Sequence, residues 1–178
     1  MRTKKTVGFA SAVFWAMLVA MPSPSLAVEE TVSAFSIWTA KGQLAKTAQN
    51  EATFVGALEG RVYVNTEEGP VEAGQMLCPA IVRIDTTSGV QSATGNCTIT
   101  SMDGAQMFSE ISCKGVHLVG CNGQTKVTGG TGRLQNATGG GEFTIRSNWH
   151  RAKVSAPAGA EPVPQGIMFW PELKYVLP

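Results

Sequence analysis

Few side chains in this sequence have the types and spacing that enzymes use. The two histidines, His117 and His150, stand alone, so we expect no metal site. His117 shares its strand parity with Val119 and Cys121, which would let it face an interior as a general base or a ligand-binding group. A turn histidine beside a disulfide is the simpler interpretation, and we favour it.

The acidic side chains are equally isolated. Glu59, Arg61 and Tyr63 alternate along one face of a predicted strand, where they could bind a carboxylate or a phenol or supply an acid. A solvated strand face is the commoner role of such residues. Glu110, expected opposite Cys97, is a further lone candidate. We identify no catalytic set, and the candidate ligand-binding residues are Glu59, Tyr63, Glu110 and His117.

The glycine-rich stretch 128–141 raises the question of nucleotide binding. A G-x-G-x-x-G pattern starting at Gly130 would need glycine at position 135, which is Gln135, and no Gly-Lys-Ser/Thr follows. We therefore expect no cofactor, and instead a structural turn whose glycines permit positive φ and close approach of strand ends. These glycines are Gly129, Gly130, Gly132 and Gly139.

The four cysteines include no C-x-x-C pair, which argues against a zinc site or a thioredoxin-type site. An even number of cysteines in an exported chain indicates disulfides, and four cysteines allow three pairings. A hairpin with its turn at 86–89 would place Cys78 opposite Cys97 on one apolar face. Cys113 and Cys121 flank a second, shorter reversal. We therefore predict the disulfides Cys78–Cys97 and Cys113–Cys121.

Residues 1–27 have the pattern of a cleaved secretory signal peptide. Arg2, Lys4 and Lys5 precede a 14-residue apolar stretch, and small residues at positions 25 and 27 favour cleavage after Ala27. We favour cleavage over an uncleaved anchor, because a membrane span needs about 20 apolar residues. The prediction is a periplasmic or secreted protein with no membrane span after cleavage.

The remaining 151 residues carry 11 basic and 13 acidic side chains, a formal charge of −2. Because no basic cluster is present, this composition argues against nucleic-acid binding. The charged fraction of the whole chain is low, at 15%, and glycine is abundant, at 20 residues. Such a composition is typical of strands and tight turns, and the length suits one domain.

Alternation of apolar and polar residues predicts strands along most of the chain. Residues 52–64 have an apolar face that carries Gly56 and Gly60, which indicates strong coiling or close backbone packing. Before residue 52 the pattern is ambiguous, since 33–39 fits a strand and 44–50 fits a short helix. Further strands are expected at 77–85, 90–101, 106–113 and 142–149, with a polar loop at 65–76, an Asp-Gly hairpin at 103–104 and a bulge or turn within 116–127.

One passage resembles a known signature. Residues 128–134 (TGGTGRL), 137–139 (ATG) and the strand 142–145 (EFTI) are similar to the TGGTGxFxxAxG turn of the allene oxide cyclase and dirigent superfamily. The hairpin around 95–104 fits the strands before that turn, and the likeness in pattern covers 54–149. The resemblance implies an all-β fold, a small antiparallel barrel of about eight strands with a mostly apolar lumen, often trimeric in the plant members. Plant members cyclise a fatty-acid epoxide or steer phenoxy-radical coupling. Their working carboxylates lie on other strands, and we carry none of them over to this chain.

These patterns divide the chain into a signal peptide (1–27), an N-terminal segment (28–51), a β-barrel domain (52–154), and a Pro/Ala linker with an apolar tail (155–178). A disordered tail would not carry so many apolar side chains, so we expect it to dock on the barrel. Pro171 would restrict any strand in the tail to an edge or a break.

Three functions follow from these expectations. The one we favour is an exported, non-enzymatic barrel that binds a small apolar or amphipathic ligand or a partner. The second is a cyclase- or isomerase-type enzyme acting on a lipophilic substrate in the lumen, since catalysis by positioning leaves little motif. The third is an envelope or secreted interaction protein that uses the apolar tail 166–178. A homo-oligomer is compatible with all three.

Overall fold

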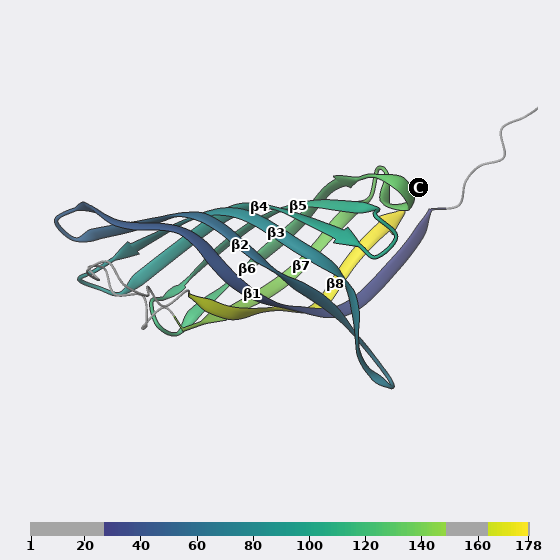
Figure 1. Ribbon diagram of the computed structural model, residues 1–178, viewed down its shortest axis with the longest axis horizontal. Coiled ribbons are helices and arrows are strands. Elements are labelled where there is room, and N and C mark those ends of the chain that lie inside the picture. The colour runs from purple at the N-terminus through teal and green to yellow at the C-terminus, as the bar shows by residue number, and fades with distance from the viewer. Residues whose placement is uncertain (1–26, 149–163, 178) are drawn as a thin grey trace, which may run out of the picture.

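The computed structural model describes residues 27–148 and 164–177, which form a closed antiparallel barrel (Figure 1). Each strand pairs with the next one along the chain, and the last strand pairs with the first. The predicted all-β, eight-stranded barrel is therefore confirmed. The elements are β1 (Val28–Ala48), β2 (Glu51–Thr66), β3 (Gly69–Asp85), β4 (Val90–Ser101), β5 (Gln106–Val116), β6 (Gly120–Gly130), the 3-10 turn η1 (Gly132–Leu134), β7 (Thr138–Ser147) and β8 (Gln165–Leu177).

Side chains alternate between the interior and the outer surface, as the pleat of a strand requires. On β3, for example, Met76, Cys78 and Val82 are buried, while the residues between them in sequence include exposed Leu77, Pro79 and Ile81 on the outer face. Inward-facing side chains from all eight strands form one apolar cluster. The largest of them are at most 2% exposed, so side chains fill the barrel: Trp38, Phe143, Met168 and Trp170.

The first disulfide joins directly opposite residues. The pairs that flank it, Leu77 with Thr98 and Ala80 with Gly95, set a register in which Cys78 on β3 faces Cys97 on β4. The Cα atoms of the two cysteines are 4.0 Å apart, and both side chains are buried. The hairpin geometry expected from the sequence is confirmed.

The second disulfide crosses the sheet diagonally. Cys113 on β5 is opposite Gly123, and Cys121 on β6 is opposite Gly115, so the bridge connects residues that are not register partners. The Cα atoms of the two cysteines are 5.7 Å apart. A Cβ on Gly123 would lie 2.5 Å from the Cβ of Cys113, so a glycine at this position leaves room for the bridge.

β1 and β2 approach closely at Gly42 and Gly56, which are register partners. A Cβ on Gly56 would lie 2.7 Å from the Cα of Gly42 and 2.5 Å from the ring of Phe54. No side chain fits at such distances, so glycine is required where the two strands meet. This is the close backbone packing that the glycines of 52–64 predicted.

The barrel extends beyond the predicted limits 52–154 at both ends. Residues 28–48 form β1, so the N-terminal segment is part of the barrel, and the short helix considered at 44–50 is wrong. The apolar tail does more than dock, because it supplies β8, which closes the ring between β7 and β1. Pro171 lies at an interruption in the pairing of β8 with both neighbours, where a residue without an N–H is tolerated.

Two predicted loops are shorter than expected. Within 65–76, β2 continues to Thr66 and β3 begins at Gly69, so only Glu67 and Glu68 form the turn. Within 128–141, β6 continues to Gly130 and β7 begins at Thr138. The predicted strands at 52–64, 77–85 and 90–101 are confirmed, and a turn follows Val116 inside the region where one was expected.

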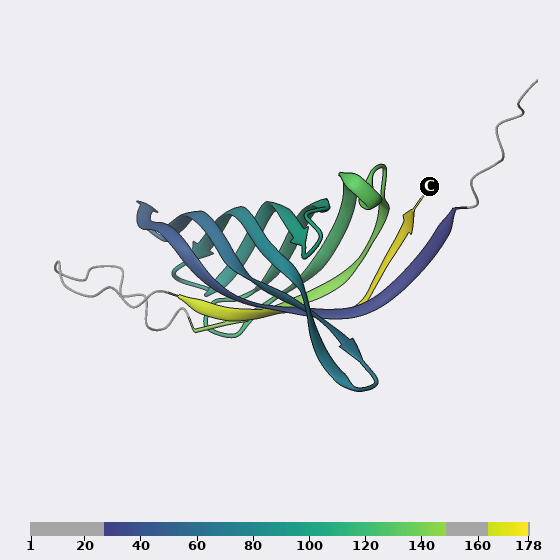
Figure 2. The same ribbon diagram turned by 45° about the vertical axis from the view of Figure 1, so that its right-hand side comes forward.

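Two hairpins project from the barrel body in different directions (Figures 1 and 2). One is the β1–β2 hairpin and the other is the tip of the β2–β3 hairpin. The described ranges contain no helix that could cross a membrane. Residues 1–26 of the predicted signal peptide, and His150, lie outside the described residues.

Candidate binding groove

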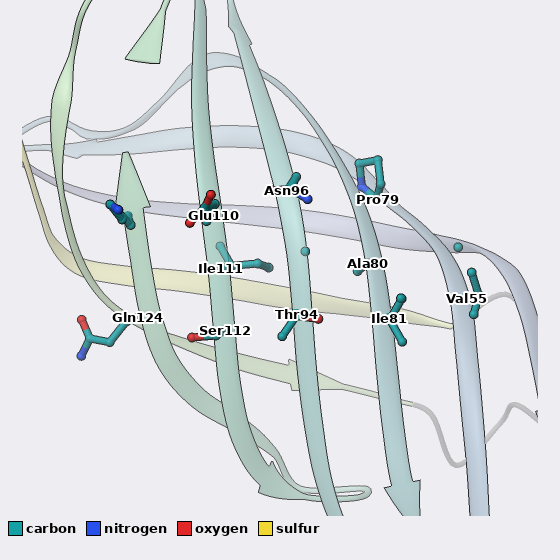
Figure 3. A pocket seen from close by; sticks show the side chains of 13 residues that line it. Val55, Pro79, Ala80, Ile81, Thr94, Asn96, Glu110, Ile111, Ser112 and Gln124 are labelled. Atoms are coloured by element: carbon teal, nitrogen blue, oxygen red, sulfur yellow. The ribbon is translucent and has the colours of Figure 1, made fainter. Parts of the chain in front are cut away.

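An open groove of about 610 Å³ crosses the outer face of the barrel from β2 to β6 (Figure 3). Its lining combines apolar surface with a few polar and charged side chains, which is the usual character of ligand sites. The residues used below are Val55, Gly56, Pro79, Ala80, Ile81, Thr94, Gly95, Asn96, Glu110, Ser112, Gln124 and Lys126.

The floor of the groove follows a row of small residues. Gly56 pairs with Ala80, and Ala80 pairs with Gly95, on three neighbouring strands. Gly56, Ala80 and Gly95 face the interior, as do Leu58, Cys78 and Cys97 on the same strands. Because these three residues are small, little side-chain volume lies beneath the sheet at this point. A Cβ on Gly95 would lie 2.7 Å from the backbone oxygen of Pro79, which shows how closely the backbones approach here. The outer face is hollowed as a result.

The rim of the groove carries a polar row. Glu110 on β5 is the register partner of Asn96 on β4 and of Lys126 on β6, so the three side chains stand next to one another on the outer face. All three are exposed, and in the described part of the chain Glu110 and Lys126 form no ion pair with each other. A ligand with both a charged group and an apolar body would find complementary surfaces side by side.

Of the four predicted candidates, only Glu110 lines this groove. The expected register was one residue off, because Cys97 faces Ser109 and Glu110 faces Asn96. Since neighbours on a strand point to opposite faces, this places Glu110 on the outer surface. Ser109 is the residue that points inward, and it is 5% exposed.

Glu59 and Tyr63 lie on a different part of the outer face. Both line a separate hollow of about 360 Å³ beside Ile37 and Arg61. Glu59 accepts a hydrogen bond from Lys41 Nζ at 2.5 Å, and Arg61 Nη1 is 3.0 Å from a carboxylate oxygen of Glu72. These are surface ion pairs, so the simpler interpretation of this face as solvated accounts for them.

Tyr63 also belongs to an aromatic row across three strands. Its ring stacks on Phe35 of β1, with ring centroids 5.1 Å apart, and Phe35 is the register partner of Phe169 on β8. Ile37 and Ile167 extend this surface, and they are 57% and 39% exposed. We call this surface the aromatic row, and its residues are Phe35, Ile37, Tyr63, Ile167 and Phe169. No local sequence pattern indicates this surface, because it depends on the pairing of the tail with β1.

His117 lies in the turn between β5 and β6, away from the groove. Its backbone N–H donates to Gly89 O at 2.7 Å. Its Nδ1 atom is buried and has no hydrogen-bond partner among the described residues. Burial lowers the pKa of the His117 imidazole below its usual range. The position agrees with a turn histidine that stays neutral, close in sequence to the Cys121 disulfide.

The glycine-rich turn supports the barrel end rather than the groove. Gly129, Gly132 and Gly139 have φ values of 152°, 58° and 141°, whereas Gly130 does not have a positive φ. Thr131 N–H donates to Gln106 O at 2.8 Å, and Gln106 N–H donates to the Thr131 hydroxyl at 3.1 Å. These reciprocal bonds tie the turn to β5. Within the described ranges, no group of three His, Cys, Asp or Glu side chains could hold a metal ion.

Comparison of the sequence with family models and curated proteins finds no relative of this chain. The surfaces described above therefore carry the functional argument.

Proposed function

We propose that the protein is an exported, non-catalytic barrel that binds an amphipathic ligand in the groove on its outer face. The observation that carries the proposal is the placement of the polar row Asn96–Glu110–Lys126 beside the small-residue floor of that groove. The apolar part of a ligand would cover Val55, Pro79 and Ile81, and its polar end would meet the row. The opposite charges of Glu110 and Lys126 suit a polar or zwitterionic head group.

The packed interior favours an outer-face site over a site in the lumen. A cyclase or isomerase that folds its substrate inside the barrel needs a chamber, and Trp38, Phe143 and Trp170 occupy that space. Opening such a chamber would require removing large, well-packed side chains, which costs several kcal/mol for each one. Binding at the surface requires no such rearrangement.

Two features support export. Residues 1–27 have the three-part pattern of a signal peptide, and both disulfides suit an oxidising compartment. A periplasmic or secreted location follows as part of the proposal. The likeness of 128–145 to the cyclase and dirigent turn supports a relationship in fold, and we transfer no activity from it.

A groove-filling variant tests the proposal. Thr94→Trp places an indole in the groove, whereas Ser92→Trp adds the same side chain to the same face of β4 outside it. With anilinonaphthalene sulfonate as an amphipathic probe, Thr94→Trp should weaken binding by about tenfold or more, a loss of at least about 1.4 kcal/mol. Ser92→Trp should bind normally. Equal affinities for the two variants would contradict the groove as the binding site.

Charge variants provide a second test of the same site. The sulfonate of the probe is negative, so Lys126→Gln should weaken binding and Glu110→Gln should strengthen it. Native mass spectrometry of protein from its own source should detect a retained amphipathic molecule that Thr94→Trp loses. A ligand retained equally by Thr94→Trp would assign binding to another surface.

The aromatic row favours a second candidate function, contact with a partner protein through the outer face of β8 and β1. Exposed apolar side chains gathered across strands are typical of interaction surfaces. The tail contributes Ile167 and Phe169 to this surface as part of the barrel wall. Phe169→Ser should abolish co-purification of a partner but leave probe binding in the groove unchanged, and a partner retained by this variant would contradict this function.

A further inference from the structure

β1 and the β2–β3 hairpin separate at one end of the barrel and leave a fork between them. β1 pairs with β8 from Val28 onward but with β2 only from Ala34 onward. β2 continues with β3 as far as Thr66, so the hairpin tip swings away from the first residues of β1 (Figures 1 and 2). We call the space between residues 28–33 of β1 and residues 65–71 of the hairpin the fork.

The fork has a strand edge with no backbone partner in the described ranges. β8 occupies one edge of residues 28–33, and no strand occupies the other. At the base of the fork, Asn65 Nδ2 donates to the Ser33 hydroxyl at 2.9 Å, where a backbone ladder would otherwise continue. Such an edge presents N–H and C=O groups in the spacing that an extended chain can pair with.

A register shift produces this separation. Between Val62 and Tyr63, the pairing of β2 with β3 slips by one residue, so Ala73 has no register partner on β2. A bulge of this kind bends a hairpin and increases its twist. The fork is therefore set by the backbone of the hairpin and does not depend on a flexible loop.

Four glutamates lie around the fork, and Lys174, opposite Thr31 on β8, is 3.6 Å from the Glu172 carboxylate. Glu29 and Glu30 stand on β1, and Glu67 and Glu68 form the hairpin tip. Glu30 accepts a hydrogen bond from the Tyr175 hydroxyl, whereas the other three make no ion pair with a described residue. Apolar side chains accompany them, with Val28 53% exposed and Val71 56% exposed.

We propose that the fork binds an extended segment of a basic partner protein by strand addition to the free edge of residues 28–33. Backbone pairing with β1 supplies the affinity, and the glutamates select lysine or arginine at alternate positions of the segment. Apolar residues at the intervening positions contact Val28 and Val32. The site shares no residue with the groove, so this inference goes beyond the proposed function.

A second copy of this chain is a poorer occupant. Antiparallel pairing of two β1 edges would bring Glu29 and Glu30 of both copies together, and like charges across strands are destabilising. A basic segment reverses the sign of this interaction. The charge on the edge thus distinguishes between the two occupants.

Peptide binding to the full chain tests the proposal. The probe is a short synthetic peptide of alternating lysine and valine, and its controls are a glutamate–valine peptide and a lysine–valine peptide that is N-methylated at alternate residues. The lysine–valine peptide should bind, should bind less well as salt rises, and should protect the amides of residues 28–33 from hydrogen exchange. Neither control should bind, because one has the wrong charge and the other cannot pair with the edge.

Matched variants link the binding to the fork. The triple variant E29Q/E67Q/E68Q should weaken the lysine–valine peptide by about tenfold. The variant E51Q/E59Q/E142Q changes the charge by the same amount away from the fork and should bind normally. Thermal melting of both variants checks that the barrel is intact.

Three results would overturn the proposal. The first is equal binding of the lysine and glutamate peptides, or of the N-methylated peptide. The second is equal weakening by the two triple variants. The third is protection of residues 28–33 that increases with protein concentration when no peptide is present, which would assign the edge to a second copy.

Discussion

The Arg133 guanidinium donates from Nε to the Asp103 carboxylate at 2.7 Å, which joins the turn before β7 to the turn between β4 and β5. The same carboxylate accepts hydrogen bonds from the Ser101 hydroxyl and the Ala105 N–H. The Ser101 hydroxyl, the Arg133 guanidinium and the Ala105 backbone together hold the pKa of Asp103 well below its usual range. One exposed acid thus organises two turns at the same end of the barrel.

This interaction predicts a contribution to acid stability. Because folding lowers the pKa of Asp103, the ionised carboxylate stabilises the barrel above the unfolded pKa of about 4, and the effect is lost as pH falls through the folded pKa. Asp103→Asn should lower the Tm at neutral pH and reduce the loss of Tm on acidification. Hydrogen bonds from Ser88 and Thr87 also lower the pKa of Asp85. Asp85 is present in both the wild type and Asp103→Asn, so the difference in Tm between the two proteins reports on Asp103. An equal fall in Tm for the wild type and the variant between about pH 7 and pH 2 would contradict this prediction.

Removing the first disulfide should cost more stability than removing the second. Cys78 and Cys97 are 19 residues apart in sequence, whereas Cys113 and Cys121 are 8 apart. A longer closed loop restricts the unfolded chain more, and a loop of the first size contributes about 3 kcal/mol. Urea unfolding of C78A/C97A and C113A/C121A should show the larger loss for the first pair. The reverse order would show that packing of the diagonal bridge outweighs loop length.

A buried hydrogen bond between β6 and β8 predicts a sensitive position. Trp170 Nε1 donates to the Thr125 hydroxyl at 2.8 Å, and both side chains are buried. Thr125→Val keeps the shape but leaves the indole N–H without an acceptor, which should lower the free energy of unfolding by about 1–3 kcal/mol. Thr128→Val, at an exposed position of the same strand, is the control and should change it by less than about 0.5 kcal/mol. Equal effects of the two changes would show that the bond is replaced, for example by water.

Tyr175 should titrate late and affect stability at alkaline pH. Burial, together with the hydrogen bond to Glu30, raises the pKa of Tyr175 to about 12. A raised folded pKa means that the neutral phenol stabilises the barrel below about pH 10 and that this stabilisation is lost as pH rises through the folded value. Tyr175 should therefore ionise at higher pH than free tyrosine does, as followed by ultraviolet absorbance. In Tyr175→Phe, the late phase should disappear, and its persistence would assign it to Tyr63.

Sequence patterns were sufficient for the core strands and the disulfides, because both depend on local alternation and short hairpins. The pair Cys78–Cys97 follows from a single tight turn between β3 and β4. The long β1 was ambiguous because Lys41–Ala48 is mostly exposed on both faces, which removes the period-two signal. For the same reason, the pattern of residues 65–76 indicates a loop rather than the tip of the β2–β3 hairpin.

The candidate site depended on information that no local pattern contains. The sequence indicates Glu110 as a candidate, but only the register of three strands brings Asn96 and Lys126 beside it. A register error of one residue moves every side chain to the other face of the sheet, so a small uncertainty at the turn had a large effect. The aromatic row depends on the pairing of the tail with β1, which brings together residues that are far apart in the sequence.

Pairing of β8 with β1 also has a consequence for biosynthesis. The first and last strands of the barrel are joined, with Val28 opposite Leu177, so the ring cannot close until the final residues have been synthesised. Until then β1 lacks a neighbour that covers its whole length, and the nascent chain stays open. Long-range pairing of this kind is slow. The closed barrel therefore forms as a whole, only after β8 has been made.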